Sequence, residues 1–82
     1  MDQIILTFVR EQFKASIGRT SIGPETSLFS TGIVDSFGVL ELIAFLEQTF
    51  GVEVDPARHA PQEFDTVAKI AALVTRLAMK AS

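Results

Sequence analysis

The residues of this chain best suited to chemistry are Asp35 and Ser36, which stand side by side just before a strongly amphipathic stretch. Ser36 offers a hydroxyl group, and serine is also a good N-cap for a helix. A helix is expected over residues 37–50, so this hydroxyl would be exposed at a helix N-terminus, where an enzyme could attach a group. Alone, the dipeptide is a weak signal, because a serine at a helix start is often an ordinary cap.

The sequence shows no convincing catalytic or metal-binding constellation. His59 is the only histidine, and it falls in a segment, residues 55–61, that we expect at the surface. A small hydrolase using Ser36 and His59 would need an orienting carboxylate and an oxyanion site, and no signature of either is present. The chain has no Cys, and its carboxylates lack a recognisable ligand spacing. The sequence therefore favours a non-catalytic protein without a metal site.

Three long amphipathic helices would position Ser36. Apolar residues recur at spacings of three and four over residues 2–17, 37–50 and 66–79, as expected for helices that face a core on one side. Gly51 would end the second helix, and Asp65 would be the N-cap of the last. The positions expected to face the core are Leu6, Val9, Phe13, Ile17, Leu42, Leu46, Phe50, Val67, Ile70, Val74 and Leu77.

The connections between these helices differ in length. Residues 19–35 carry turn residues and several apolar side chains, so this segment should pack across the helices, with Leu28 and Phe29 as its main anchors. An Asp-Pro pair at residues 55–56 resembles an N-cap followed by proline at the first helical position, which leaves room for one short turn of helix before Pro61. The expected fold is all-α: a small antiparallel helical bundle of three main helices plus one short helix, with a long loop between helices 1 and 2.

Gly38 disagrees with the second predicted helix, because glycine in a helix interior costs up to about 1 kcal/mol relative to alanine. Two explanations are open. Either another part of the backbone or core approaches closely at this position, or the first turn of the helix is locally loose.

Length and composition limit the function classes. The 82 residues are expected to form one domain, 1–82, and an apolar fraction of 48% supports a packed core. The net charge is −3, and no basic patch suggests nucleic acid as a partner. The sequence contains neither a signal peptide pattern nor a run near the roughly 20 apolar residues that span a bilayer. Together with the absence of Cys, this suits a cytoplasmic protein, which we expect to be a monomer.

The segment around Ser36 resembles the attachment segment of acyl carrier and peptidyl carrier domains. Residues 27–37, SLFSTGIVDSF, contain an apolar pair, a glycine, and then Asp-Ser followed by a large apolar residue, a pattern typical of that family. Residues 40–52 are similar to the second helix of the family and its end, and residues 63–70 resemble the start of its last helix. The likeness covers essentially the whole chain, and the three segments together would rarely match by chance.

The resemblance implies a carrier rather than an enzyme. Members carry 4'-phosphopantetheine on the motif serine, here Ser36, where a phosphopantetheinyl transferase attaches it from coenzyme A. The preceding carboxylate, here Asp35, supports this magnesium-dependent transfer. The thiol of the attached arm holds an acyl or aminoacyl group as a thioester. The implied partners are the transferase, an adenylating acyl or aminoacyl ligase, and a downstream acyltransferase or synthase.

The same resemblance implies that partner enzymes contact the second helix. Phe37, Val39 and Leu40 would lie near the base of the arm. Glu41 and Glu47 could meet cationic enzyme surfaces, although they could equally belong to an ordinary solvated face. A rival interpretation is a cofactor-free helical adaptor that binds a partner through this helix.

The predicted second helix also bears on the type of carrier. Residues 37–50 contain only two carboxylates, whereas fatty-acid synthesis carriers usually have a densely acidic second helix. This argues against a role in fatty-acid synthesis. Residues 32–36, GIVDS, and residues 63–66, EFDT, look more like the corresponding segments of freestanding carriers served by an adenylating ligase, such as D-alanyl carrier proteins and specialised secondary-metabolite carriers. Lipid, cell-wall and secondary-metabolite biosynthesis are the pathways that this resemblance suggests.

Overall fold

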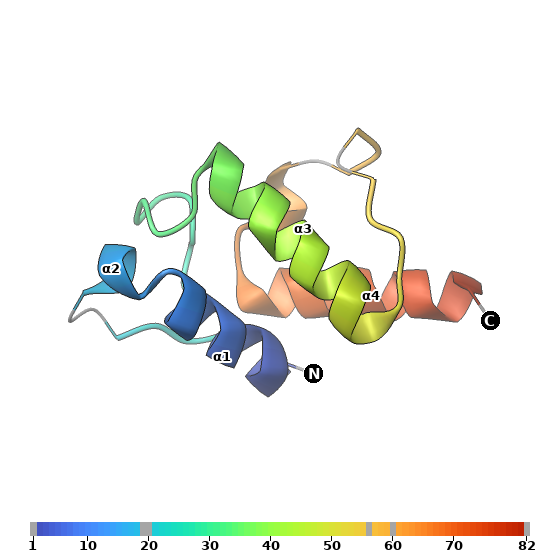
Figure 1. Ribbon diagram of the computed structural model, residues 1–82, viewed down its shortest axis with the longest axis horizontal. Helices are drawn as coiled ribbons and strands as arrows, with labels where there is room; N and C mark the ends of the chain where they lie inside the picture. The colour runs from blue at the N-terminus through green and yellow to red at the C-terminus, as the bar shows by residue number, and fades with distance from the viewer. Residues whose placement is uncertain (1, 19–20, 56, 60, 82) are drawn as a thin grey trace.

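The computed structural model describes residues 2–18, 21–55, 57–59 and 61–81. These residues form α1 (Asp2–Gln12), α2 (Lys14–Ile17), α3 (Ser36–Phe50), the 3-10 helix η1 (Pro61–Phe64) and α4 (Val67–Ala81). They contain no strand, which confirms the all-α prediction and the long loop before α3. Figure 1 shows α1 running in the opposite direction to both α3 and α4. None of the helices in these ranges is long and apolar enough to cross a lipid bilayer.

The first predicted helix is divided in two. Phe13 interrupts it, with φ −109° and ψ 26°, and α2 then ends at Gly18, whose φ is 59°. The expectation of one continuous helix to residue 17 is therefore wrong. Phe13 and Ile17 are nevertheless both buried, so the apolar stripe continues across the break. The interruption places the Phe13 ring against the start of α3, as described below.

The core is built from the apolar stripes of the helices and from the long loop. Leu28 is fully buried and Phe29 is half-buried, which confirms the two residues as anchors of the loop. Leu77 and Phe50 are only partly buried at the ends of their helices. The other positions predicted to face the core are all buried: Leu6, Val9, Phe13, Ile17, Leu42, Leu46, Val67, Ile70 and Val74.

The N-cap of α4 is not the predicted residue. Thr66 caps the helix, because its Oγ1 accepts a hydrogen bond from the N–H of Lys69 at 3.1 Å. The carboxylate of Asp65 instead accepts hydrogen bonds from the hydroxyl of Ser27 at 2.8 Å and from the N–H of Phe29 at 3.1 Å. Asp65 therefore joins the long loop to the beginning of α4.

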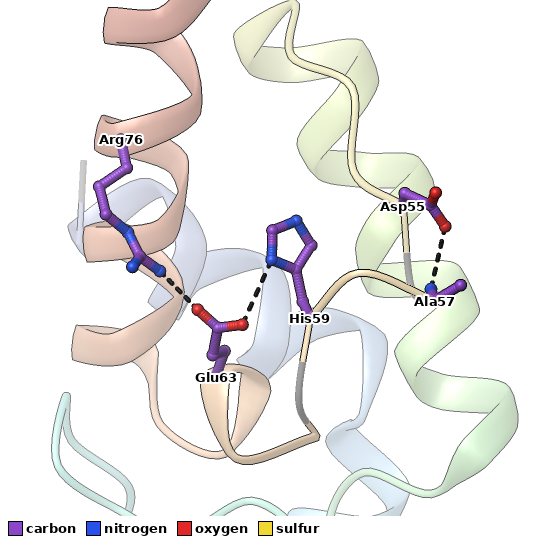
Figure 2. A network of polar contacts seen from close by, with 5 residues as sticks. All are labelled: Asp55, Ala57, His59, Glu63 and Arg76. Atoms are coloured by element: carbon purple, nitrogen blue, oxygen red, sulfur yellow. Dashed lines mark hydrogen bonds and ion pairs between the residues drawn. The ribbon is translucent and has the colours of Figure 1, made fainter.

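The short helix lies later in the chain than expected. The residues before it form a turn in which the N–H of Ala57 donates to Asp55 Oδ1 at 2.9 Å (Figure 2). The 3-10 helix begins at Pro61, the residue at which the sequence pattern was expected to end a helix. Proline is well suited to a first helical position, because its missing N–H has no partner to lose there. The predicted helical start at Pro56 lies outside the described residues.

Candidate functional site

Asp35, and not Ser36, is the N-cap of α3. The backbone of Asp35 is extended, with φ −110° and ψ −169°, and its Oδ1 accepts a hydrogen bond from the N–H of Gly38 at 2.8 Å. The prediction that Ser36 would cap the helix is therefore wrong; Asp and Ser cap helices about equally well, so their order alone does not decide between them. Ser36 is the first helical residue. Its hydroxyl is exposed and has no hydrogen-bond partner among the described residues.

The position of Ser36 suits a phosphate ester. The hydroxyl lies at the N-terminus of a 15-residue helix, where backbone N–H groups and the helix dipole favour negative charge. The carboxylate of Asp35 already satisfies one N–H group of this turn, that of Gly38. The N–H groups of the first two helical residues have no intrahelical partner, as at any helix start. A phosphodiester on Ser36 therefore fits the local electrostatics.

Gly38 explains how the start of α3 is held in place. This residue is buried, and a Cβ atom built on it would lie 2.8 Å from Cε1 of Phe13 and 3.1 Å from Cγ1 of Val34. Of the two explanations left open by the sequence, close approach is the correct one. The Phe13 ring occupies the space that a larger residue would need, so the first turn of α3 packs tightly against the break between α1 and α2.

An open pocket of about 760 Å³ lies beside Ser36. It is lined by the end of the long loop, by the first turns of α3 and by residues at and before η1. Among the described lining residues, the polar side chains are those of Asp35, Ser36 and His59. The apolar side chains on its walls are those of Phe29, Val34, Val39, Leu40, Pro61 and Phe64.

His59 was not expected at this site, and the fold brings it there. Its side chain is only 18% exposed, and its Nδ1 lies 3.2 Å from Oε2 of Glu63. The other carboxylate oxygen of Glu63 accepts a hydrogen bond from Arg76 of α4 at 2.5 Å (Figure 2). This hydrogen bond from Arg76, with a further contribution from His59, lowers the pKa of Glu63. No direct hydrogen bond joins Ser36 and His59 in the described part of the chain.

The residues predicted to contact partners differ in exposure. The side chains of Phe37 and Leu40 are 78% and 57% exposed, which is unusual for large apolar residues, whereas Val39 is half-buried. Glu41 is exposed and accepts a hydrogen bond from Gln12 of α1 at 2.9 Å. Their contacts with other proteins stay a prediction.

Glu47 has a structural partner of its own. Its Oε2 accepts a hydrogen bond from the N–H of Val54 at 3.1 Å, so it holds the segment that follows α3. This contact gives Glu47 a structural role beside the predicted contact with an enzyme.

A family model described as "Phosphopantetheine attachment site" matches residues 3–74. The chain is also 40% identical over 53 residues to D-alanyl carrier protein 1 of Lactiplantibacillus plantarum (strain ATCC BAA-793 / NCIMB 8826 / WCFS1), a match that covers 65% of this chain and 66% of the relative. It is 39% identical over 46 residues to the D-alanyl carrier protein of Streptococcus pyogenes serotype M5 (strain Manfredo), covering 56% and 58% of the two chains. These matches span 66% and 58% of the length of the two relatives, in each case less than two thirds.

The family match covers most of the chain: α1 from its second residue, all of α2, α3 and η1, and α4 as far as Val74. The proteins that it describes are non-catalytic carriers with a covalently attached 4'-phosphopantetheine group. An exposed serine hydroxyl at a helix N-terminus, beside a pocket, lies within the matched residues. The chain belongs to the phosphopantetheine attachment site family.

Proposed function

We propose that Ser36 carries the 4'-phosphopantetheine group, joined to its Oγ as a phosphodiester. The observation that carries this proposal is the state of the hydroxyl: it is exposed, at the N-terminus of α3, and free of hydrogen bonds within the described residues. Asp35 caps the helix in its place, so modification of Ser36 would remove no bond that the helix needs. The family match includes this segment.

Asp35 is proposed to support the transferase reaction. Only Oδ1 of its carboxylate caps α3, and Oδ2 has no partner among the described residues. The side chain is exposed and adjacent to the hydroxyl that would be modified. An anionic oxygen in this position can bind a magnesium ion that the phosphopantetheinyl transferase brings with coenzyme A, because Mg²⁺ prefers carboxylate ligands.

The cargo is proposed to be an aminoacyl or acyl group that an adenylating ligase activates and a downstream acyltransferase or synthase accepts. When attached, phosphopantetheine supplies the thiol that holds this group as a thioester, in a chain that has no Cys of its own. The names of the two relatives support D-alanine as the first cargo to test and cell-wall biosynthesis as the pathway. Loading from coenzyme A would take place in the cytoplasm.

Intact mass spectrometry tests the attachment residue. The purified chain is incubated with coenzyme A and a broad-specificity phosphopantetheinyl transferase, alongside the Ser36→Ala and Ser30→Ala variants. Ser30 is a second exposed serine, in the loop before α3. We expect a gain of one phosphopantetheine in the wild type and in Ser30→Ala, and none in Ser36→Ala. A gain that persists in Ser36→Ala contradicts the proposal, and a folded wild type that gains no mass favours the cofactor-free adaptor.

The cargo is tested on the phosphopantetheine-loaded protein. The loaded chain is incubated with ATP, D-alanine and a D-alanine-adenylating ligase. A second mass gain of one alanyl group, removed by hydroxylamine, supports the proposed cargo. Loading by other amino acids or carboxylic acids with their ligases, but not by D-alanine, would assign a different cargo to the same carrier.

A further inference from the structure

His59 is the polar side chain that the fold adds to the pocket beside Ser36. It lies 23 positions beyond Ser36 in the sequence, in the segment before η1, and it lines the same pocket. Apart from Asp35 and Ser36, the other described lining residues are apolar or glycine. A group that enters this pocket therefore meets one further polar side chain, that of His59.

Two neighbours contact the imidazole of His59, and a third residue holds one of them. Nδ1 contacts Glu63, and the carboxylate of Glu63 is itself held by Arg76. The ring also packs edge-to-face against Phe64, with centroids 6.5 Å apart and an interplanar angle of 82°. Figure 2 shows Glu63 between His59 and Arg76, which come from the segment before η1 and from α4. The imidazole is thus held in one orientation at the pocket wall.

The contact with Glu63 determines which ring nitrogen remains available. Hydrogen bonding to Arg76 lowers the pKa of Glu63, so its side chain is a carboxylate near neutral pH and can only accept hydrogen bonds. Nδ1 must then be the protonated nitrogen of a neutral His59. Nε2 is left to accept a hydrogen bond, or to donate one when the imidazole is protonated.

We propose that His59 is a positioning residue for the tethered arm, and that its Nε2 forms a hydrogen bond with a hydroxyl or amide group of the 4'-phosphopantetheine on Ser36. This inference rests on the proposed function. The arm would begin at the pocket wall, where apolar lining residues such as Val39 and Phe64 could accommodate its methyl and methylene groups. Its hydroxyl and amide groups would lose hydrogen bonds to water in such surroundings unless a protein group replaces them. Among the described lining residues outside the attachment pair, His59 supplies that group.

Nuclear magnetic resonance of the full chain tests this contact in the wild type. The protein is loaded with isotope-labelled phosphopantetheine, loading is confirmed by mass, and the side-chain nitrogen signals of His59 are compared before and after loading. We expect the Nε2 signal to shift on loading and the arm amides to show order parameters above about 0.6, the value below which a group counts as flexible. Unchanged His59 signals in a fully loaded protein would overturn the inference.

Two variants separate positioning from a structural effect. His59→Leu removes the contact with Glu63 and the proposed hydrogen bond to the arm. His59→Gln keeps a side chain that can donate and accept hydrogen bonds. We expect arm order parameters below about 0.6 in His59→Leu, with partial recovery in His59→Gln. Arg58→Gln is the matched control. Arg58 is adjacent to His59 in the sequence, but its side chain is 82% exposed and does not line the pocket, so this variant should behave as the wild type.

The outcomes distinguish this inference from the proposed function. If the chain gains no mass with the transferase, the proposed function fails and the inference fails with it. If the chain is loaded but the arm is equally mobile in the wild type and in His59→Leu, the inference alone fails. The wild-type comparison needs no variant, so it decides the question even if His59→Leu does not fold.

Discussion

At the scale of single residues, the candidate site depends on how two neighbours divide their tasks. Asp35 caps α3 through Oδ1, and the hydroxyl of Ser36 makes no hydrogen bond with the described residues. A residue that both capped the helix and carried a bulky group would have to exchange one function for the other. Here the group can be added while the helix start keeps its hydrogen bond.

Substitution of Asp35 should separate its two roles. Asp35→Ala removes the cap and should lower the free energy of unfolding by about 1 kcal/mol, whereas Asp35→Asn keeps an acceptor and should stay close to the wild type. If the proposed role in transfer is correct, both variants should gain phosphopantetheine more slowly. Urea denaturation and initial rates of the mass gain measure the two effects. Wild-type loading of Asp35→Asn would show that the negative charge is not required.

Gly38→Ala should destabilise the protein although alanine is the better helix former. The helix gains up to about 1 kcal/mol, but a Cβ atom 2.8 Å from the Phe13 ring is an overpacking cost of roughly 1–3 kcal/mol. Phe13 is buried and its ring also meets Phe8 edge-to-face, at a centroid distance of 6.3 Å, so it has little room to move. We expect a net loss of about 1 kcal/mol in urea denaturation.

The background variant Phe13→Leu provides the control for Gly38→Ala. A smaller side chain at position 13 should remove the clash, so Gly38→Ala should then be neutral or stabilising, and the double-mutant cycle should show coupling between the two positions. Equal effects of Gly38→Ala in both backgrounds would mean that the ring is not the obstacle.

At the scale of elements, Asp65 joins the long loop to α4 through hydrogen bonds from Ser27 and Phe29. The Ser27 hydroxyl, and then the N–H of Phe29, lower the pKa of the Asp65 carboxyl below its ordinary value of 3.8. A lowered folded-state pKa means that the unfolded chain binds the proton more readily. The stability contributed by Asp65 is therefore fully present above about pH 4 and is lost as the pH falls through the lowered pKa.

Denaturation of Asp65→Asn as a function of pH tests this contribution of the Asp65 carboxylate to stability. Relative to the wild type, the variant should lose less stability between about pH 5 and pH 2, because it has no proton to bind there. Asp65→Ala should be less stable by about 2 kcal/mol at pH 7, since the N–H of Phe29 loses a charged partner. Identical pH profiles of Asp65→Asn and the wild type would show that Asp65 contributes nothing to the acid sensitivity.

The sequence predicted which helices exist better than where they begin. Periodic apolar residues identified the stripes correctly, because burial of one face is a property of each helix alone. The caps were less predictable, since both helix starts carry two adjacent residues that can act as an N-cap: Asp35 with Ser36, and Asp65 with Thr66. At the second start, Ser27 and Phe29 of a distant loop bind the carboxylate, and local sequence cannot show this.

The pocket and the position of His59 could not be predicted from local patterns. The contact between His59 and Glu63 has the spacing of a helical turn and was a detectable signal. The approach of His59 to the Ser36 pocket instead depends on how the segment after α3 returns across the fold, which involves residues far apart in sequence. The same holds for Gly38, whose neighbour Phe13 comes from the break between α1 and α2.

At the scale of the whole molecule, the exposed apolar residues at the start of α3 mark the face that we expect enzymes to bind. Phe37→Ala should change the free energy of unfolding by less than about 0.5 kcal/mol, because the side chain is 78% exposed. If Phe37 is an anchor for the transferase, kcat/KM for loading should fall at least about tenfold. Thr49→Ala, an exposed position near the other end of α3, is the control and should load normally.

A normal loading rate for Phe37→Ala would remove Phe37 from the proposed enzyme contact. The same steady-state comparison with the adenylating ligase would show whether the two enzymes use the same face. Size-exclusion chromatography with light scattering checks the prediction of a monomer, and one cooperative unfolding transition is expected for a single domain over residues 1–82.

The tight contact between Gly38 and Phe13 has a consequence for delivery. The first turn of α3 cannot rotate or slide without displacing a buried ring. The attachment point of the proposed tether is therefore fixed relative to the rest of the protein. The volume that its thiol can sample is then a fixed zone around one point, set by the length of the arm. An enzyme that binds this single turn in one orientation thereby also sets where, relative to its own surface, the cargo can arrive.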